Sequence, residues 1–180
     1  MKTVKAWYFS KEPKRLRYGD DRKIILGDTH EVCCEPELCE RGLHGSVRLI
    51  DALDYAPGPI IWRVELSGKM DIGDDKIAAT KRTYIAGGVN IEHILRRFAR
   101  KCALDVANLC DAQDVVIEYL KTGNDGIADA ARAAVWDAVW DAAWAAAWAA
   151  ARGAAWDELR NKQNKRLTSM VTRAINRRSI

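Results

Sequence analysis

A short glycine-flanked turn carries the side chains best suited to bind an anion. It reads Arg41-Gly42-Leu43-His44-Gly45-Ser46 and is followed by Arg48. Glycine lets a backbone approach a ligand closely, and Ser46 can begin a helix whose free N–H groups favour negative charge. Arg41, His44 and Arg48 add positive charge or hydrogen-bond donors. The pattern predicts a phosphate-binding turn, although an ordinary strand-to-helix turn has the same composition.

Four tryptophans form the second unusual feature. Trp136, Trp140, Trp144 and Trp148 recur at every fourth position of residues 127–160, a stretch dominated by alanine. A four-residue step turns a helix by about 40° beyond a full circle, so these indoles form a slanting ridge, here called the tryptophan ridge. A nucleotide base can stack on such indoles, for which we single out Trp136, Trp140 and Trp144. Two other interpretations stay open: the indoles fill the core, or they are buried in an oligomer.

Another sector of the same helix is uniformly small. Small side chains allow two helix backbones to approach closely, so this face is expected to pack on another helix of the chain or on its copy in a homo-oligomer. The residues of this sector are Ala131, Val135, Ala138, Val139, Ala142, Ala145, Ala146, Ala149, Ala150 and Gly153.

The cysteines do not form a recognisable metal motif. Cys33, Cys34, Cys39 and His44 lie within twelve residues, but their spacing matches no common zinc pattern, so we expect no metal. The chain has five cysteines, an odd number, which favours reduced thiols and a cytoplasmic location. It contains no phosphate-binding P-loop, no Rossmann fingerprint and no nucleophile elbow. We therefore expect no cofactor, and any enzyme site would have to be assembled from scattered residues.

Composition limits the other classes of function. The chain has 180 residues, 48% of them hydrophobic, and a formal charge of +4. No apolar run approaches the ~20 residues that span a bilayer, so no membrane segment is expected. The last twenty residues are rich in Lys and Arg, and Arg166 is the member that we consider for phosphate binding. A solvated helix face explains this basic segment more simply than nucleic-acid binding does.

Composition changes near Gly87-Gly88. Before it, residues 4–9, 23–26, 60–66 and 76–85 resemble strands, and Ser46 is expected to cap a short helix. After it, helices are expected from Asn90 onward, around residues 115–120, along the Ala/Trp stretch and over residues 167–175, the last either continuous with that stretch or broken around residues 161–164. The fold class predicted is α+β, with a small mixed β region over residues 1–88 and a helical region over residues 89–180.

Four short sequence blocks, in this order along the chain, carry a resemblance to a known family. They are Cys39-Glu40-Arg41-Gly42-Leu43-His44, residues 52–58 (ALDYAPG), residues 64–68 (VELSG) and residues 74–79 (DDKIAA). On these blocks the chain resembles, over roughly residues 30–110, a family of small bacterial and phage proteins of uncharacterised function. Many relatives also end in an Ala/Trp/Arg-rich helix. The resemblance implies a phage protein, and small phage proteins without catalytic motifs often inhibit host defence by holding a signalling nucleotide.

Three hypotheses follow. The first is a non-enzymatic protein that sequesters a cyclic nucleotide or cyclic ADP-ribose signal, with Trp136, Trp140 and Trp144 against the base. Phosphate would then be held by Arg41, His44, Ser46 and Arg48, or by the basic end near Arg166. The second is an enzyme that uses His44 as an acid or base on such a nucleotide. The third is a module that binds a host protein or nucleic acid through its basic C-terminal helix.

Overall fold

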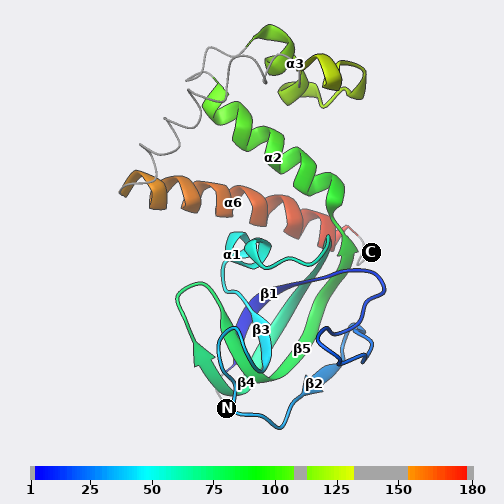
Figure 1. Cartoon of the computed structure of the whole chain (residues 1–180), viewed down its shortest axis with the longest axis vertical. Coiled ribbons are helices and arrows are strands. Elements are labelled where there is room, and N and C mark those ends of the chain that lie inside the picture. Colours follow the sequence, from blue (N-terminus) through cyan, green and yellow to red (C-terminus); the bar gives the residue numbers. More distant parts are fainter. Residues whose placement is uncertain (1–2, 108–112, 132–153, 178–180) are drawn as a thin grey trace. The chain divides into compact units, whose positions relative to one another are not determined.

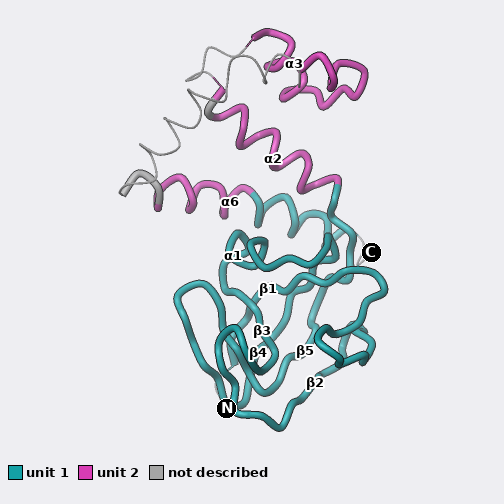
Figure 2. The backbone as a smooth tube through the Cα atoms, viewed as in Figure 1, with its two compact units in different colours: residues 1–92, 167–180 teal, residues 93–166 magenta. Residues whose placement is uncertain are grey.

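The structure is a computed structural model of the chain, and it describes residues 3–107, 113–131 and 154–177 (Figure 1). The chain divides into two compact units (Figure 2). Unit 1 comprises Met1–Glu92 and Leu167–Ile180, and unit 2 comprises His93–Arg166. The strands lie in the N-terminal part and the longer helices in the C-terminal part, which confirms the α+β fold class. The return of the last residues to unit 1 is not indicated by the composition change at Gly87-Gly88.

One antiparallel sheet forms the body of unit 1. Its strand order is β1-β4-β5-β2, and β3 also pairs with β5. The bounds of the strands are β1 (Val4–Ser10), β2 (Thr29–Glu31), β3 (Leu43–Gly45), β4 (Ile60–Ile72) and β5 (Ile77–Asn90). The two longest strands, β4 and β5, form a hairpin that supports the rest of the sheet.

The β4–β5 hairpin extends further than its hydrophobic runs. Ser67-Gly68 resembles a turn in the sequence, yet the pairing continues past it through a shift in register between Ser67 and Met70. Gly68 adopts a φ of 80°, and the Lys69 amide donates to Thr80 Oγ1 at 3.1 Å. A bulge therefore replaces the expected strand end, because glycine allows the backbone to bend without leaving the ladder.

The sheet curls so that the residue after β3 pairs with β1, at the other edge of the sheet. Directly after β3, Ser46 exchanges two backbone hydrogen bonds with Trp7: Trp7 N donates to Ser46 O at 2.7 Å, and Ser46 N donates to Trp7 O at 3.0 Å. Glycine is favoured at position 45, because a Cβ there would lie 3.2 Å from both the Ala6 Cβ and the Trp7 carbonyl oxygen, which is a tight contact. One core cluster gathers side chains from every side of this curl, including Ala6, Leu43, Val64, Leu66, Ala79 and Tyr84.

Ser46 does not cap the short helix, which corrects the sequence-based expectation. Helix α1 (Leu49–Asp54) begins after Arg48, whose side chain makes no capping hydrogen bond. Ser46 is instead buried and held by the bridge to Trp7. Residues 43–45 of the predicted glycine-flanked turn form strand β3, so this segment closes the sheet rather than opening a helix. Since α1 has only six residues, it also offers little helix dipole for an anion.

The prediction of a strand at residues 23–26 is also wrong. Only Lys23 pairs, in an isolated bridge to Arg15, and Ile25 and Leu26 are exposed. The short apolar run has no partner strand beyond that bridge, so its side chains do not alternate between two faces. Residues 14–24 form a small hairpin, here called the 14–24 hairpin.

Helix α6 (Ala154–Asn176) ends the described chain. It passes through residues 161–164 without a break. Its C-terminal half belongs to unit 1 and buries Leu167, Val171 and Ile175, which recur every four residues. This confirms the predicted amphipathic segment. No helix among the described residues is long and apolar enough to span a membrane.

Unit 2 consists of helices. They are α2 (Glu92–Ala107), which enters it from unit 1, α3 (Asp114–Thr122), the 3-10 turn η1 (Asp125–Ile127) and the first half of α6. Within this unit, Arg166 on α6 donates to both carboxylate oxygens of Asp105 on α2, at 2.7 and 3.2 Å. The predicted turn between α3 and η1 is present: Gly123 has a φ of 68°, and Asn124 Oδ1 accepts from the Gly126 amide.

Candidate functional site

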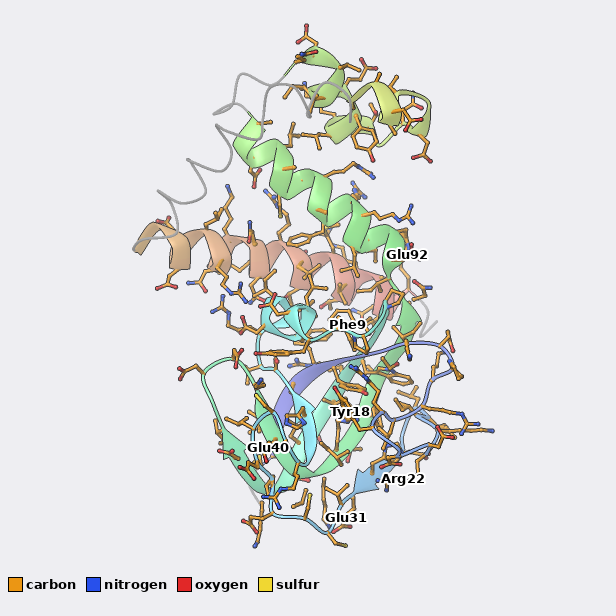
Figure 3. All side chains as sticks on the ribbon, in the orientation of Figure 1. Phe9, Tyr18, Arg22, Glu31, Glu40 and Glu92 are labelled. Atoms are coloured by element: carbon orange, nitrogen blue, oxygen red, sulfur yellow. The ribbon has the colours of Figure 1, made fainter. Side chains whose placement is uncertain are left out.

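Unit 1 contains a partly open cavity of about 640 Å³. Its walls come from β1, the 14–24 hairpin, β3, α1 and β5. Figure 3 labels three of the lining residues: Phe9 on β1, Tyr18 on the hairpin and Glu40 just before β3. Its polar and aromatic lining residues include Tyr8, Tyr18, His44, Tyr55, Lys76 and Arg82.

Arg82 on β5 is the central charge of this cavity, and its side chain is only 2% exposed. Its Nη1 donates to the His44 carbonyl oxygen at 2.7 Å, and its Nε and Nη2 donate to the Tyr84 hydroxyl at 3.0 and 2.8 Å. The guanidinium carbon lies 3.7 Å from the centroid of the Tyr8 ring. All of these partners are neutral, and none of the described carboxylates forms an ion pair with Arg82. A buried cation that is hydrogen-bonded but not neutralised attracts an anion.

Tyr84 and His30 complete the network behind Arg82. The Tyr84 hydroxyl accepts from Arg82 and lies 3.0 Å from His30 Nδ1. Since its lone pairs accept from the guanidinium, its own proton is directed to His30 Nδ1. Burial raises the pKa of Tyr84 and lowers the pKa of His30, and the charges of Arg22 and Arg82 lower the latter further. His30 is therefore neutral, and Arg82 is the cation of this network.

His44 lines the same cavity from β3. Its Nε2 is buried and has no hydrogen-bond partner within the described part of the chain. Burial lowers the pKa of His44, and the nearby charges of Arg82 and Lys76 act in the same direction. A neutral imidazole with a free nitrogen can accept or donate one hydrogen bond or accept a proton, but it adds no positive charge.

A second cation, Lys76, immediately precedes β5. Lys76 Nζ is 4.1 Å from the centroid of the Tyr55 ring, and Tyr55 donates a hydrogen bond to Asp75. Hydrogen bonds to the Cys39 and Tyr55 side chains raise the pKa of Lys76, so it is fully protonated at neutral pH. The cavity therefore has a buried cation on one side and a more exposed cation beside an aromatic ring on another.

The residues expected to bind phosphate are not all brought together. Arg41 is exposed and paired with Glu37, and it does not line the cavity. Ser46 lines it but is held in the bridge to Trp7. Arg48 lies 3.6 Å from the Asp51 carboxylate, with Nε and Nη2 buried without a hydrogen bond to the described residues. Of the glycine-flanked turn, His44 is the residue best placed for a ligand.

The remaining expected residues lie elsewhere. Arg166 belongs to unit 2, where its charge is paired with Asp105. Trp136, Trp140 and Trp144 lie outside the described residues, as does the small-residue sector beyond Ala131. No group of three or more His, Cys, Asp or Glu side chains in the described ranges is arranged to hold a metal ion.

Sequence reasoning did not single out Arg82, Tyr8, Tyr18 or Lys76 as site residues. A signal for Arg82 was available: it lies within the predicted strand 76–85, two residues before Tyr84, so both side chains share one face of that strand. A charged residue on the same face as a large aromatic one is unusual for a core strand. No comparable local signal identifies Tyr18 or Tyr8, because the curl of the sheet and the 14–24 hairpin bring them to the cavity.

Comparison with known proteins identifies part of the chain. Residues 22–97 match a family described as a domain of unknown function (DUF7666). No match to the chain is found among the curated proteins or among the solved structures. The matched residues include His44, Lys76 and Arg82, whereas Tyr8 and Tyr18 precede them. Residues 22–97 are thus a domain of an uncharacterised family, and this domain supplies most of the polar residues of the cavity.

Proposed function

We propose that unit 1 binds an anionic, nucleotide-like small molecule in this cavity and releases it unchanged. The observation that carries the proposal is the Arg82 guanidinium, which is buried, lines the cavity and has only neutral partners. An anionic group would neutralise this charge inside a low-dielectric site, where charge-assisted hydrogen bonds are strong.

The size and lining of the cavity support the same class of ligand. Small-molecule sites usually enclose about 300–1,000 Å³, and this cavity encloses about 640 Å³. Its cationic side chains are Arg17, Lys76 and Arg82, and its acidic ones are Asp20 and Glu40. Asp20 is already paired with Arg22, so positive charge is in excess. Tyrosines 8, 18 and 55 add aromatic rings to the lining.

We extend the proposal to the biological role of the protein. The ligand would be an immune signal of the cyclic nucleotide or cyclic ADP-ribose type, and its sequestration would inhibit host defence. The support is the resemblance to small phage and bacterial proteins and the absence of a catalytic motif in the sequence. Stacking on the tryptophan ridge and assembly through the small-residue face belong to this wider proposal.

The direct test is native mass spectrometry of the purified protein with a panel of nucleoside phosphates, cyclic nucleotides and cyclic ADP-ribose isomers. Bound ligand is then released by heat and identified by chromatography. A ligand that is retained and recovered unchanged supports binding without catalysis. Failure of every anionic compound to bind would contradict the proposal.

One observation favours a second candidate, an enzyme acting on the same ligand. His44 Nε2 has no hydrogen-bond partner among the described residues, and burial keeps the ring neutral, as a general base requires. The same experiment separates the two functions, because an enzyme returns product after heat release. Loss of product formation in His44→Gln, with binding retained, would assign the base.

A further inference from the structure

The 14–24 hairpin is firmly attached at its base. Two backbone hydrogen bonds of 2.8 and 3.0 Å join its arms, and Leu16 and Ile24 are buried in the core of the sheet. Arg22 pairs with the Asp20 carboxylate and donates to the carbonyl oxygen of Glu31 at 3.1 Å. The tip of the hairpin is therefore held in a fixed place at the cavity.

The tip has an unusual residue for its backbone. Tyr18 and Gly19 have φ values of 61° and 83°, and the Asp20 amide donates to the Arg17 carbonyl oxygen at 3.3 Å. Two consecutive positive φ values are typical of a type I′ turn, in which asparagine, aspartate or glycine is preferred at the first position. A tyrosine in the left-handed region is destabilising, and such outliers are concentrated at functional sites.

Packing does not explain this tyrosine. Tyr18 is 91% exposed, more than any other large hydrophobic side chain described as exposed. The guanidinium carbon of Arg17 lies 4.7 Å from the centroid of its ring, and both residues line the cavity. The structure thus holds an uncovered aromatic ring, with a cation on one face, at the cavity whose interior contains the unneutralised Arg82.

We propose that Tyr18 recognises a planar heterocycle of the ligand by stacking, while Arg82 holds an anionic group of the same molecule. This inference rests on the function proposed above and specifies its ligand class: a phosphorylated nucleoside, in which base and phosphate are part of one compound. Tyr18 is then a specificity-determining residue that separates nucleotides from sugar phosphates and from free phosphate.

Adenosine monophosphate and ribose 5-phosphate are suitable probes, because they share the phosphate and the sugar and differ in the base. Stacking on one aromatic side chain is worth about 1–3 kcal/mol, which corresponds to roughly 5- to 150-fold in affinity. Calorimetric titration of the wild-type protein is expected to show adenosine monophosphate binding more tightly by a factor in this range.

The informative variant is Tyr18→Asn, since asparagine suits the turn and the lost ring is exposed. Its midpoint of thermal unfolding is expected to equal or exceed that of the wild type. Its affinity for adenosine monophosphate is expected to fall to that for ribose 5-phosphate, which itself stays unchanged. Tyr18→Phe is expected to retain the preference. Ile25→Asn is the matched control, because Ile25 is an exposed apolar residue just beyond the hairpin that does not line the cavity.

The outcomes are distinguishable. If both probes bind the wild type and Tyr18→Asn leaves their affinities unchanged, or weakens both equally, Tyr18 does not recognise the base and this inference is overturned. If no anionic probe binds the wild type, the proposed function itself fails, and this inference fails with it.

Discussion

At the scale of single residues, the cavity depends on how Arg82 is held. Its guanidinium is planar and donates three hydrogen bonds, one to the His44 carbonyl oxygen and two to the Tyr84 hydroxyl. A lysine at this position would keep the charge but lose the fork of donors. Replacing Arg82 with lysine therefore separates the effect of its positive charge from the effect of its hydrogen-bond geometry.

For Arg82→Lys we expect anionic ligands to bind at least about tenfold more weakly, since the single ammonium nitrogen lacks the planar fork of donors that contacts Tyr84, the His44 carbonyl oxygen and a bidentate anion. Loss of hydrogen bonds from a buried charged group is expected to lower the free energy of unfolding by about 2–4 kcal/mol. Calorimetric titration and urea denaturation measure the two effects. Arg41→Lys is the matched control at an exposed arginine outside the cavity. Unchanged binding in Arg82→Lys would show that geometry at this residue is unimportant.

Two histidines, the buried His30 and the partly buried His44, make the stability dependent on pH. Burial lowers the folded-state pKa of His30 and of His44, so the unfolded chain binds protons more readily than the folded one. Their contribution is fully present above the unfolded histidine pKa of about 6.5 and is lost as pH falls below it toward the lowered folded values. Urea denaturation between pH 5 and pH 8 should show stability rising with pH. His30→Gln and His44→Gln should each flatten this slope. His93→Gln, at an exposed histidine on α2, serves as the control.

At the scale of elements, sequence patterns predicted β1, the core of the β4–β5 hairpin and the apolar face of α6. They failed where long-range pairing decides the outcome. The pairing of β4 with β5 continues past Ser67 because Gly68 allows a bulge. Ser46 closes the sheet by pairing with Trp7, and no local sequence pattern predicts this long-range contact. The site was predicted only in part for the same reason: His44 was found through its local sequence, whereas Arg82 and Tyr18 line one cavity only because of the tertiary structure.

A comparison of two glycines, one in a crowded site and one in open space, tests how tightly the β4–β5 hairpin is packed. Gly87 has a φ of 108°, and a Cβ there would lie 2.4 Å from the Ile61 carbonyl oxygen. Gly19 has a φ of 83° and no atom within 4 Å of such a Cβ. We expect Gly19→Ala to cost about 1–2 kcal/mol of unfolding free energy from backbone strain alone, and Gly87→Ala to cost about 3 kcal/mol or more. Urea denaturation compares them, and equal losses would contradict the close approach of β4 and β5 at Gly87.

At the scale of the whole molecule, charge is distributed differently in the two units. Unit 1 keeps Arg82 without a counter-charge among the described residues, whereas Arg166 and Lys162 of unit 2 share the carboxylate of Asp105. The sequence alone does not distinguish a basic residue with a counter-charge from one without, so the fold is needed to show which cation is available to a ligand.

The Asp105–Arg166 pair is expected to be structural and modest in strength. Ion pairs near the surface contribute about 0.2–1 kcal/mol, so a double-mutant cycle of Asp105→Asn and Arg166→Gln should give a coupling free energy in that range. We expect Arg166→Gln to leave the affinity of unit 1 for anionic ligands unchanged, as calorimetric titration can measure. A large loss of affinity for anionic ligands in Arg166→Gln would show that Arg166 contributes to ligand binding.

The bridge between Ser46 and Trp7 bears on how this domain can be moved between proteins. The family match begins at residue 22, but the sheet is closed by β1, which ends at Ser10. A segment cut at the family boundary would keep His44, Lys76 and Arg82 but lose Tyr8 and expose the backbone edges of β4 and of the residues after β3. Such unpaired edges promote association between chains. The segment that the family model matches is thus smaller than the sheet that forms the cavity, and an engineered fusion must include β1 to keep Tyr8 and the closed sheet.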